Sequence, residues 1–297
     1  MISKLKFAVL GGDTRQIAVA NRFCEEGLRV HVFGLPQKEL FPQIVHFSDW
    51  REAICGVDAV VLPLPASPDG KHLNQPLCNE QEAPLLADVF DLLAKDVKIF
   101  GGRFSPAVKS LAEERKKTVI DYFNSEDLQE KNALPTAEGA VAILMREIPR
   151  TVSGLSVGVT GYGRVAKALI RLLLAMGADV TVTARKQGDI ERAAKQGCKT
   201  VLLDGKHALT RFAQQKAVIF NTVPYWLFSE DVLATMSQAT QIIDLASAPG
   251  GVDANAADLH GIKVIWALSL PGKYAPVTAG ELIADTVLSQ LHKEDLL

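Results

Sequence analysis

The six-residue segment 161–166 carries the clearest chemical signal in this sequence. It reads Gly-Tyr-Gly-Arg-Val-Ala and follows the apolar segment 155–160. In a phosphate-binding turn, Gly161 would permit a tight bend, Gly163 would let the backbone approach a pyrophosphate, and Ala166 would allow close helix–strand packing. The helix that starts here offers unpaired N–H groups and a positive dipole end to phosphates. We therefore predict a dinucleotide site at Gly161, Tyr162, Gly163, Arg164, Val165 and Ala166, with a purely structural glycine turn as the alternative.

The end of the next apolar segment, residues 179–184, indicates which dinucleotide binds. An NAD site usually carries Asp or Glu at this point, about 20 residues beyond the turn, to accept from the ribose 2′-hydroxyl. This sequence has Arg185 and Lys186 instead. A carboxylate would repel a 2′-phosphate, whereas a guanidinium can bind it through two parallel hydrogen bonds. We therefore expect NADP rather than NAD, with a solvated basic turn as the alternative.

The amino-terminal segment also begins with a strand and glycines, but it lacks the phosphate-binding pattern. Residues 11–15 read Gly-Gly-Asp-Thr-Arg, so Asp13 stands where the second glycine would be. Its carboxylate would cap the following helix itself and would repel a pyrophosphate. We therefore expect no dinucleotide here, and a surface open to a substrate or a partner. Arg15 would contact that substrate or form a surface ion pair.

Loops rich in Gly and Pro follow several other expected strands. In open α/β sheets, ligands bind at the carboxyl ends of the strands. The loops occupy residues 101–104, 221–224, 245–251 and 270–280. The second of them adds Asn221, Thr222 and Val223 to the expected cofactor site. The alternative for each loop is a turn that only connects elements of the core.

Short apolar segments alternate with amphipathic ones along the whole chain, which is typical of β-α-β units and parallel sheets. In the first half, we expect strands at 5–10, 28–33, 57–62, 97–100 and 118–122, and helices at 14–26, 80–94 and 106–116. In the second half, we expect six strands, at 155–160, 179–184, 199–203, 217–221, 241–245 and 263–267. The pattern predicts an α/β protein with two doubly wound parallel-sheet, Rossmann-like domains.

The length of 297 residues agrees with two domains. Pro135 stands in the first turn of a strongly predicted helix, where its missing N–H costs nothing. We expect this helix, at 135–148, to bridge the domains. Residues 1–134 would form a substrate or partner domain. Residues 135–297 would form the NADP-binding domain, which would include a closing helix at 278–292. The sequence does not show whether this helix packs on its own domain or on the first one.

Composition excludes several classes of protein. Lys and Arg number 32 against 34 Asp and Glu, so the basic surplus of a nucleic-acid-binding protein is missing. The apolar fraction of 48 % indicates a packed core instead of disorder. No apolar run is long enough to span a membrane. The cysteines and histidines lack metal-ligand spacing, so we expect reduced thiols in the cytoplasm and no metal site.

With these features identified, the chain resembles the A-subunit family of dipicolinate synthase. The matching segments cover both predicted domains: Ala-Val-Leu-Gly-Gly-Asp-Thr-Arg-Gln at 8–16, Leu-Pro-Thr-Ala-Glu-Gly at 134–139, the turn at 161–164, Asp-Leu-Ala-Ser-Ala-Pro-Gly-Gly at 244–251, and Leu-Pro-Gly-Lys-Tyr-Ala-Pro-Val-Thr-Ala-Gly at 270–280. The resemblance implies an NADP-dependent oxidoreductase that oxidises dihydrodipicolinate to dipicolinate (pyridine-2,6-dicarboxylate) for spore formation. It also implies a flavoprotein-like B subunit, which would be the partner, and a location in the mother-cell cytoplasm of a sporulating bacterium. We further expect a homo-oligomer.

A dicarboxylate substrate would need cations and neutral hydrogen-bond donors. The candidates for carboxylate binding are Arg15, Arg103 and Lys273, with Thr136 and Ser247 as neutral donors. Glu138 is the candidate proton acceptor, or else a solvated first-turn acid stabilised by the helix dipole. Because the product is aromatic, such a reaction needs orientation of the ring more than a strong base.

Two other functions remain open. The more distantly similar D-2-hydroxyacid dehydrogenases use an Arg after the fifth strand and a His near the end. This chain has Ser247 and the His-free segment 271–274 there, which argues against carbonyl chemistry with its proton relay. The missing acid–base residues also allow a non-catalytic NADP-binding scaffold that activates the flavoprotein-like partner. The resemblance assigns no role to His72.

Overall fold

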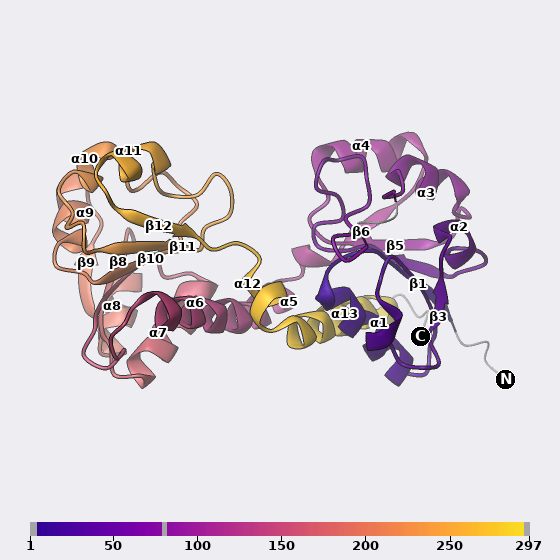
Figure 1. The fold of residues 1–297 in the computed structure, drawn as a ribbon, viewed down its shortest axis with the longest axis horizontal. Helices are drawn as coiled ribbons and strands as arrows, with labels where there is room; N and C mark the ends of the chain where they lie inside the picture. The colour runs from indigo at the N-terminus through magenta and orange to yellow at the C-terminus, as the bar shows by residue number, and fades with distance from the viewer. Residues whose placement is uncertain (1–4, 79–81, 294–297) are drawn as a thin grey trace. The chain divides into compact units, whose positions relative to one another are not determined.

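The computed structural model describes residues 5–78 and 82–293, which form two compact units (Figure 1). The first unit contains the described residues up to Asn132 together with those from Ala275 onward, and the second contains residues 133–274. Each unit is built on a six-stranded sheet in which all neighbouring strands are parallel. The expected α/β class with two Rossmann-like domains is therefore confirmed.

The sheet of the first unit has the strand order β3-β2-β1-β4-β5-β6. Its strands are β1 (Lys6–Leu10), β2 (Arg29–Phe33), β3 (Val45–Phe47), β4 (Ala59–Val61), β5 (Lys98–Gly101) and β6 (Val119–Asp121). Its helices are α1 (Thr14–Glu25), α2 (Trp50–Ala53), α3 (Leu86–Leu92), α4 (Pro106–Glu114), α5 (Glu126–Lys131) and α13 (Pro276–Lys293), with short 3-10 turns η1 (Gln37–Glu39) and η2 (Tyr122–Asn124).

Alternate residues of each strand enter two different cores, one on each face of this sheet. On β1, Phe7 and Val9 pack with α1 and α13, whereas Ala8 and Leu10 pack with the side of α2, α3 and α4. All four side chains are fully buried. Burial on both faces is the reason why these parallel strands read as short continuous apolar runs.

The sheet of the second unit has the equivalent strand order, β12-β11-β10-β7-β8-β9. Its strands are β7 (Ser156–Thr160), β8 (Asp179–Ala184), β9 (Lys199–Leu202), β10 (Val218–Asn221), β11 (Gln241–Asp244) and β12 (Lys263–Trp266). Its helices are α6 (Ala133–Glu147), α7 (Arg164–Ala175), α8 (Gln187–Lys195), α9 (Lys206–Ala213), α10 (Glu230–Leu233), α11 (Ala254–Leu259) and α12 (Leu270–Tyr274). This is the order of a dinucleotide-binding sheet.

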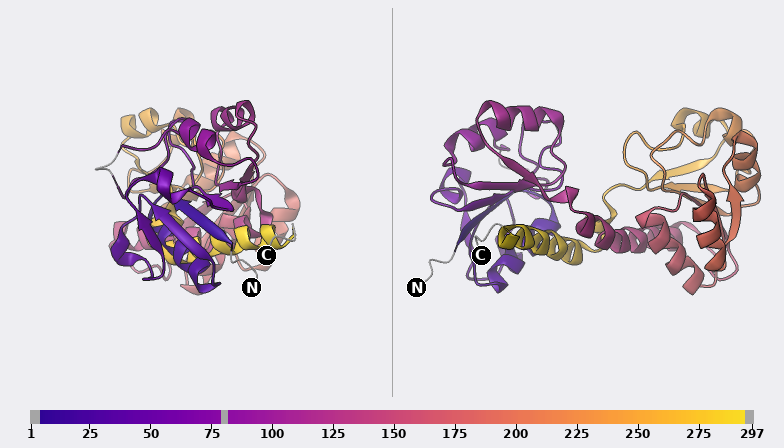
Figure 2. Two further views of the ribbon diagram at one scale, coloured as in Figure 1. Left: turned by 90° about the vertical axis from the view of Figure 1, so that its right-hand side faces the viewer. Right: turned by 180° about the vertical axis from the view of Figure 1, so that it is seen from behind.

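The closing helix α13 differs from the expectation, because it belongs to the first unit and not to the cofactor-binding one (Figures 1 and 2). It lies against α1, and its apolar face enters the first unit's core through Ile283, Ala284 and Val287. Gly280 makes the close approach possible, because a Cβ there would lie 2.6 Å from the Ala18 Cβ. The apolar face shows that the helix is buried, but it does not show against which core.

Four smaller expectations change as well. The helix expected at 80–94 is α3, which begins only at Leu86, and the first two residues of that range lie outside the described residues. Strand β3 and helix α2 were not expected at all. The segment 270–280 is helical, in α12 and the start of α13, instead of a loop. In the part of the chain that the structure describes, no helix combines the length and apolar character needed to cross a membrane.

Candidate functional site

The glycine turn at 161–166 has the geometry of a phosphate-binding turn. Gly161 follows β7, and its N–H donates to the carbonyl oxygen of Thr183 at 2.7 Å. Its φ is +87°, and a Cβ there would lie 2.8 Å from the Thr222 Oγ1, so this position requires glycine. A Cβ on Gly163 would meet nothing within 4 Å, and no side chain of the described residues caps α7. The space beside Gly163, at the start of α7, is therefore open.

A pocket of about 800 Å³ adjoins this turn. It lies where β8, β9 and β10 end, and its walls include Leu203, Leu209 and Leu227. Tyr225 and Trp226 also line it, and they are 68 % and 54 % exposed. Apolar and aromatic walls of this kind are typical of small-molecule and cofactor sites.

The basic residues Arg185 and Lys186 line the same pocket. Both side chains are exposed, and neither has a hydrogen-bond or ion-pair partner within residues 5–78 and 82–293. Of the four acids that line the pocket, Asp189 is paired with Arg192 at 2.5 Å and Asp231 with Lys206 at 2.7 Å, whereas Asp253 caps α11 and Glu230 is exposed. Arg185 and Lys186 therefore place positive charge in the pocket that adjoins the glycine turn, an arrangement that can bind the phosphate groups of a dinucleotide.

Asn221, which the sequence placed among the cofactor-binding residues, is fully buried and holds loops together. It accepts a hydrogen bond from Thr160 Oγ1 at 2.5 Å, and its Nδ2 donates to Asp244 Oδ1 at 2.8 Å and to the Val223 carbonyl at 3.1 Å. Asp244 in turn accepts from the N–H of Gly251 at 2.8 Å. Asn221 therefore positions the neighbouring loops, and Val223 lines the pocket in its place.

Of the other residues predicted for this site, some are exposed and some are buried. Tyr162 lines the pocket but is only 7 % exposed, and burial raises the pKa of its hydroxyl. Arg164 is exposed, Val165 is half-buried, and Ala166 is buried against the core. Thr222 donates from Oγ1 to the Thr160 carbonyl at 2.7 Å.

The sequence reasoning missed Trp226 and Asp244. Trp226 gave a weak signal, because it stands two residues after the Asn-Thr-Val-Pro segment at 221–224, which begins at the last residue of β10. Asp244 stands at the end of an apolar strand and is 3 % exposed, and only its buried bonds reveal its role.

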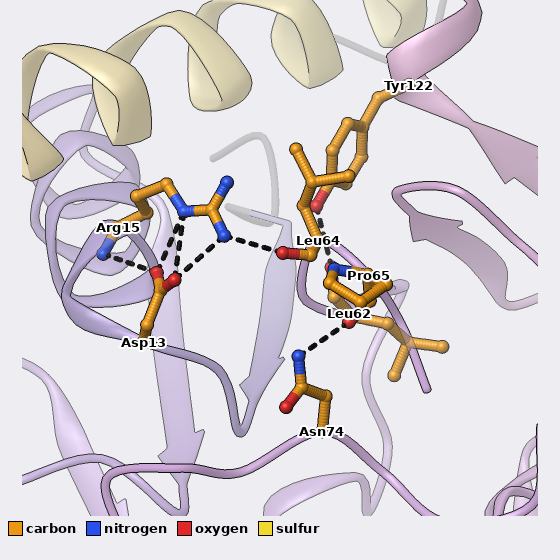
Figure 3. Close-up of polar contacts among 7 residues, drawn as sticks. All are labelled: Asp13, Arg15, Leu62, Leu64, Pro65, Asn74 and Tyr122. Carbon is orange, nitrogen blue, oxygen red and sulfur yellow. Dashed lines mark hydrogen bonds and ion pairs between the residues drawn. The ribbon is translucent and has the colours of Figure 1, made fainter. Parts of the chain in front are cut away.

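In the first unit, Asp13 caps α1 as expected, since its Oδ1 accepts from the Arg15 N–H at 3.1 Å. The Arg15 guanidinium binds the same carboxylate through Nε at 2.9 Å and Nη2 at 2.8 Å, and Nη2 also donates to the Leu64 carbonyl at 2.5 Å (Figure 3). Arg15 is 7 % exposed. Arg15 therefore forms an ion pair, but with a buried guanidinium instead of at the surface as the alternative had it, and only Nη1 points away from these partners (Figure 3).

Arg103 stands where β5 ends, in the left-handed backbone conformation with φ +51°. The Asp121 carboxylate holds this turn by accepting from the N–H groups of Arg103 at 3.0 Å and Phe104 at 3.2 Å. The guanidinium lies 4.8 Å from the centre of the Phe123 ring. A left-handed backbone costs free energy in a residue other than glycine. The contact with the Phe123 ring helps to orient the exposed guanidinium of Arg103.

The loop that follows β4 connects these two cations. Leu64 accepts from Arg15, the N–H of Ala66 donates to the Gly102 carbonyl at 2.9 Å, and the N–H of Gly102 donates to the Pro63 carbonyl at 3.1 Å. Arg15 and Arg103 therefore lie at the same edge of the first sheet, on either side of this loop.

The remaining candidates belong to the second unit. Thr136 and Glu138 are on α6, Ser247 is in the exposed loop after β11, and Lys273 is exposed on α12. Glu138 is exposed, and no described residue orients its carboxylate. The described residues contain no group of three or more His, Cys, Asp or Glu that could hold a metal ion.

Comparison with known families defines the class of this protein. Residues 136–256 match the model of the D-isomer specific 2-hydroxyacid dehydrogenase NAD binding domain, and residues 6–123 match the N-terminal domain of the dipicolinate synthase A subunit. Together with the site geometry, this defines a two-domain protein of the dehydrogenase type, whose second unit is a nicotinamide dinucleotide-binding domain.

Its relatives identify the family. The chain is 30 % identical to the dipicolinate synthase A subunit of Bacillus subtilis (strain 168) over 99 % of its own length and 98 % of the relative. A crystal structure of the same protein from Bacillus halodurans superimposes with a TM-score of 0.88 at 27 % identity, covering 98 % of this chain and 99 % of that one. The chain belongs to the A-subunit family of dipicolinate synthase. D-lactate dehydrogenase from Escherichia coli, at 16 % identity and a TM-score of 0.62 over 98 % of each chain, shares the fold.

Proposed function

We propose that this protein oxidises dihydrodipicolinate to dipicolinate with NADP, as part of dipicolinate formation in a sporulating bacterium. Membership of the family supports the substrate class. The observation that carries the choice of coenzyme is the unpaired Arg185–Lys186 pair beside the uncapped α7.

The second unit would hold the coenzyme at the glycine turn and at the basic pair that lines the same pocket. The N–H groups at the start of α7 would bind the pyrophosphate, and Arg185 and Lys186 would bind the 2′-phosphate. Trp226 and the leucines of the pocket would contact the adenine ring. When bound, NADP supplies the acceptor for a hydride.

The first unit would contribute to binding of the dicarboxylate. Arg103, fixed over Phe123, presents a planar guanidinium that suits a carboxylate, and Arg15 offers Nη1. Lys273, Thr136 and Ser247 are the candidates from the second unit, and Glu138 is the candidate proton acceptor from the sequence. The reaction removes a hydride and a proton from the ring, so the chain must orient the ring and accept the proton.

The relatives are named as one of the subunits of a synthase, which supports the further proposal of a partner. We propose that the partner is a flavoprotein-like B subunit, that the chain also forms a homo-oligomer, and that it works in the mother-cell cytoplasm.

The test is a turnover assay with the purified full chain and freshly generated dihydrodipicolinate. We expect the absorbance of reduced coenzyme to grow with NADP, and much more slowly with NAD, when no partner is present. Growth with NAD alone would overturn the choice of coenzyme. If the chain binds NADP but reduction requires the partner protein, the chain is an NADP-binding scaffold and the proposed oxidoreductase activity is wrong.

A further inference from the structure

A carboxylate is buried in the second unit at the point where β11 ends. Asp244 is the last residue of this strand and is 3 % exposed. Its Oδ1 accepts from Asn221 Nδ2 at 2.8 Å and from the N–H of Ala246 at 3.0 Å, and its Oδ2 accepts from the N–H of Gly251 at 2.8 Å. All of these partners are donors, which suits an ionised carboxylate, because that group only accepts hydrogen bonds.

The partners of Asp244 are also neutral, so no cation cancels its negative charge. Within the described part of the chain, no Lys, Arg or His forms an ion pair with this carboxylate. The backbone closes tightly over it, since a Cβ on Gly250 would lie 3.0 Å from Asp244 Oδ2. A charge that is surrounded by protein instead of water acts more strongly on its neighbours than an exposed one.

The topology of the sheet places Asp244 in one particular half of the coenzyme site. A dinucleotide-binding sheet consists of two mononucleotide-binding halves, and the pyrophosphate lies at the turn between them. In the second unit the glycine turn follows β7, and Arg185, the expected partner of the 2′-phosphate, follows β8 on one side of β7. The nicotinamide half therefore belongs to the other side of β7, where β10 and β11 end and Asp244 stands.

Little other charge stands at this part of the sheet edge. The loops after β10, β11 and β12, at 222–229, 245–253 and 267–273, contain two charged residues, Asp253 and Lys273. Asp253 is half-buried, caps α11 and lines the pocket that contains Arg185, and Lys273 is exposed on α12. Asp244 is therefore the buried charge among these loops and the strand ends that carry them.

We propose that the carboxylate of Asp244 makes the coenzyme site prefer the oxidised coenzyme over the reduced one. The inference rests on the proposed function. The nicotinamide ring of oxidised NADP carries a positive charge, which the transfer of a hydride removes. A buried negative charge in the nicotinamide half therefore attracts the form that enters the reaction and not the NADPH that leaves it.

This preference has a cost and a benefit for the proposed reaction. It stabilises the hydride acceptor before the transfer, so it opposes the chemical step itself. The oxidation yields an aromatic ring, which gives the reaction a large driving force of its own. In return, NADPH is released more easily and competes less well for the site. Asp244 is thus a specificity-determining residue and not a catalytic one.

Asp244 also holds the loop 245–251 in place, and this role can be separated from its charge. Trp266 supports the same loop without a charge, because its Nε1 donates to the Ala246 carbonyl at 3.0 Å. A loosened loop should weaken the binding of both coenzyme forms alike, whereas a lost charge should weaken the binding of the oxidised form alone. The ratio of the two dissociation constants therefore distinguishes the two roles.

The experiment measures the Kd of oxidised NADP and of NADPH by calorimetric titration of the full chain, as wild type and as Asp244→Asn. We expect the ratio of the Kd for NADPH to the Kd for oxidised NADP to fall about tenfold, the effect of one unit charge on another across a protein site. Asp244→Ser is a second uncharged variant, whose smaller side chain leaves room for a water, and it should lower the ratio by the same factor should the amide disturb the fold.

Two matched variants keep the charge of Asp244. Trp266→Phe removes one hydrogen bond to the same loop. Asp253→Asn removes a half-buried carboxylate that lines the pocket. Neither should change the ratio by more than about twofold. An unchanged ratio in the Asp244 variants, or an equal fall in Trp266→Phe, would overturn the inference while the proposed function stands. A wild-type chain that binds neither coenzyme form would overturn the proposed function and this inference together.

Discussion

The two units have the same strand order, yet their first β-α turns treat a helix N-terminus in opposite ways. In the second unit no side chain caps α7, and the space beyond Gly163 is open. In the first unit the Asp13 carboxylate caps α1 and binds Arg15 at 2.8 Å. One acid at the position of the second glycine therefore decides whether the turn can bind an anion or is closed by its own side chains.

The loop after β4 completes this difference. A Cβ on Gly11 would lie 2.7 Å from the Asn74 carbonyl oxygen, and one on Gly12 would lie 2.9 Å from the Pro63 Cβ. The same loop also donates from Asn74 to the Pro65 carbonyl at 3.0 Å (Figure 3). The Asn74 backbone and the Pro63 ring thus occupy the space beside Gly11 and Gly12 where a pyrophosphate would lie in a dinucleotide-binding turn.

The largest effect is expected on NADP binding, when an acid like Asp13 is placed at the equivalent position of the second unit. Gly163→Asp should weaken NADP binding at least about 100-fold, because a carboxylate would cap α7 and repel the pyrophosphate, and charged hydrogen bonds are worth about 1.5–3 kcal/mol each. The backbone of Gly163 is not left-handed and the space around its Cβ position is open, so the free energy of unfolding should stay close to that of the wild-type chain. Calorimetric titration with NADP measures the loss. Gly163→Ala, with no charge, is the control and should lose less. Equal losses in the two variants would show that bulk, and not charge, closes the turn.

Removing the acid from the first unit should destabilise the protein. Asp13→Ala removes the cap of α1 and leaves Arg15, which is 7 % exposed, without its carboxylate. We expect the free energy of unfolding to fall by about 2–4 kcal/mol, measured by urea denaturation.

The chain offers a matched control for this change. Asp49 caps α2 with the same Asp-x-Arg pattern, but its pair with Arg51 is exposed. Asp49→Ala should therefore cost only about 1 kcal/mol. If the two variants lower the free energy of unfolding by the same amount, the burial of Arg15 does not matter.

Asp13→Gly should leave the stoichiometry of NADP binding at one, because the loop after β4 still fills the turn of the first unit.

The features that the sequence predicted correctly are those that local pattern determines. Asp13 could be assigned as a cap because a short acid before an apolar periodic segment satisfies the first N–H groups of a helix. The glycine turn could be assigned because each of its small residues is needed for a local reason, either the conformation of the backbone or the packing of the helix on the strand.

The features that it missed depend on distant parts of the chain. Strand β3 has three residues, of which Val45 and His46 are exposed, so no apolar run marks it. The apolar face of α13 would suit either core, and only the close approach at Gly280 places it on α1. Asn221 has the composition of a ligand-binding residue, but its partners Thr160 and Asp244 lie on neighbouring strands.

A smaller effect is expected where the second unit selects its coenzyme. Arg185→Ala should weaken NADP binding about 10- to 100-fold, the equivalent of one charged contact, and change NAD binding little. Lys206→Ala is the control, because Lys206 lines the same pocket but is already paired with Asp231. Its effect on both coenzymes should stay within about threefold. Parallel titrations with the two coenzymes give the ratio, and an unchanged ratio in Arg185→Ala would remove this residue from the phosphate site.

The smallest effect concerns Arg103 in the first unit, where two variants separate charge from backbone strain. Arg103→Ala and Arg103→Gly both remove the guanidinium, so each should raise KM for the dicarboxylate about tenfold, the equivalent of 1.4 kcal/mol, with NADP affinity unchanged. Only glycine adopts the left-handed backbone without cost, so Arg103→Gly should be about 1 kcal/mol more stable to urea than Arg103→Ala. If KM stays at the wild-type value in both, the strained backbone does not serve substrate binding, and the first unit must bind its ligand through other residues.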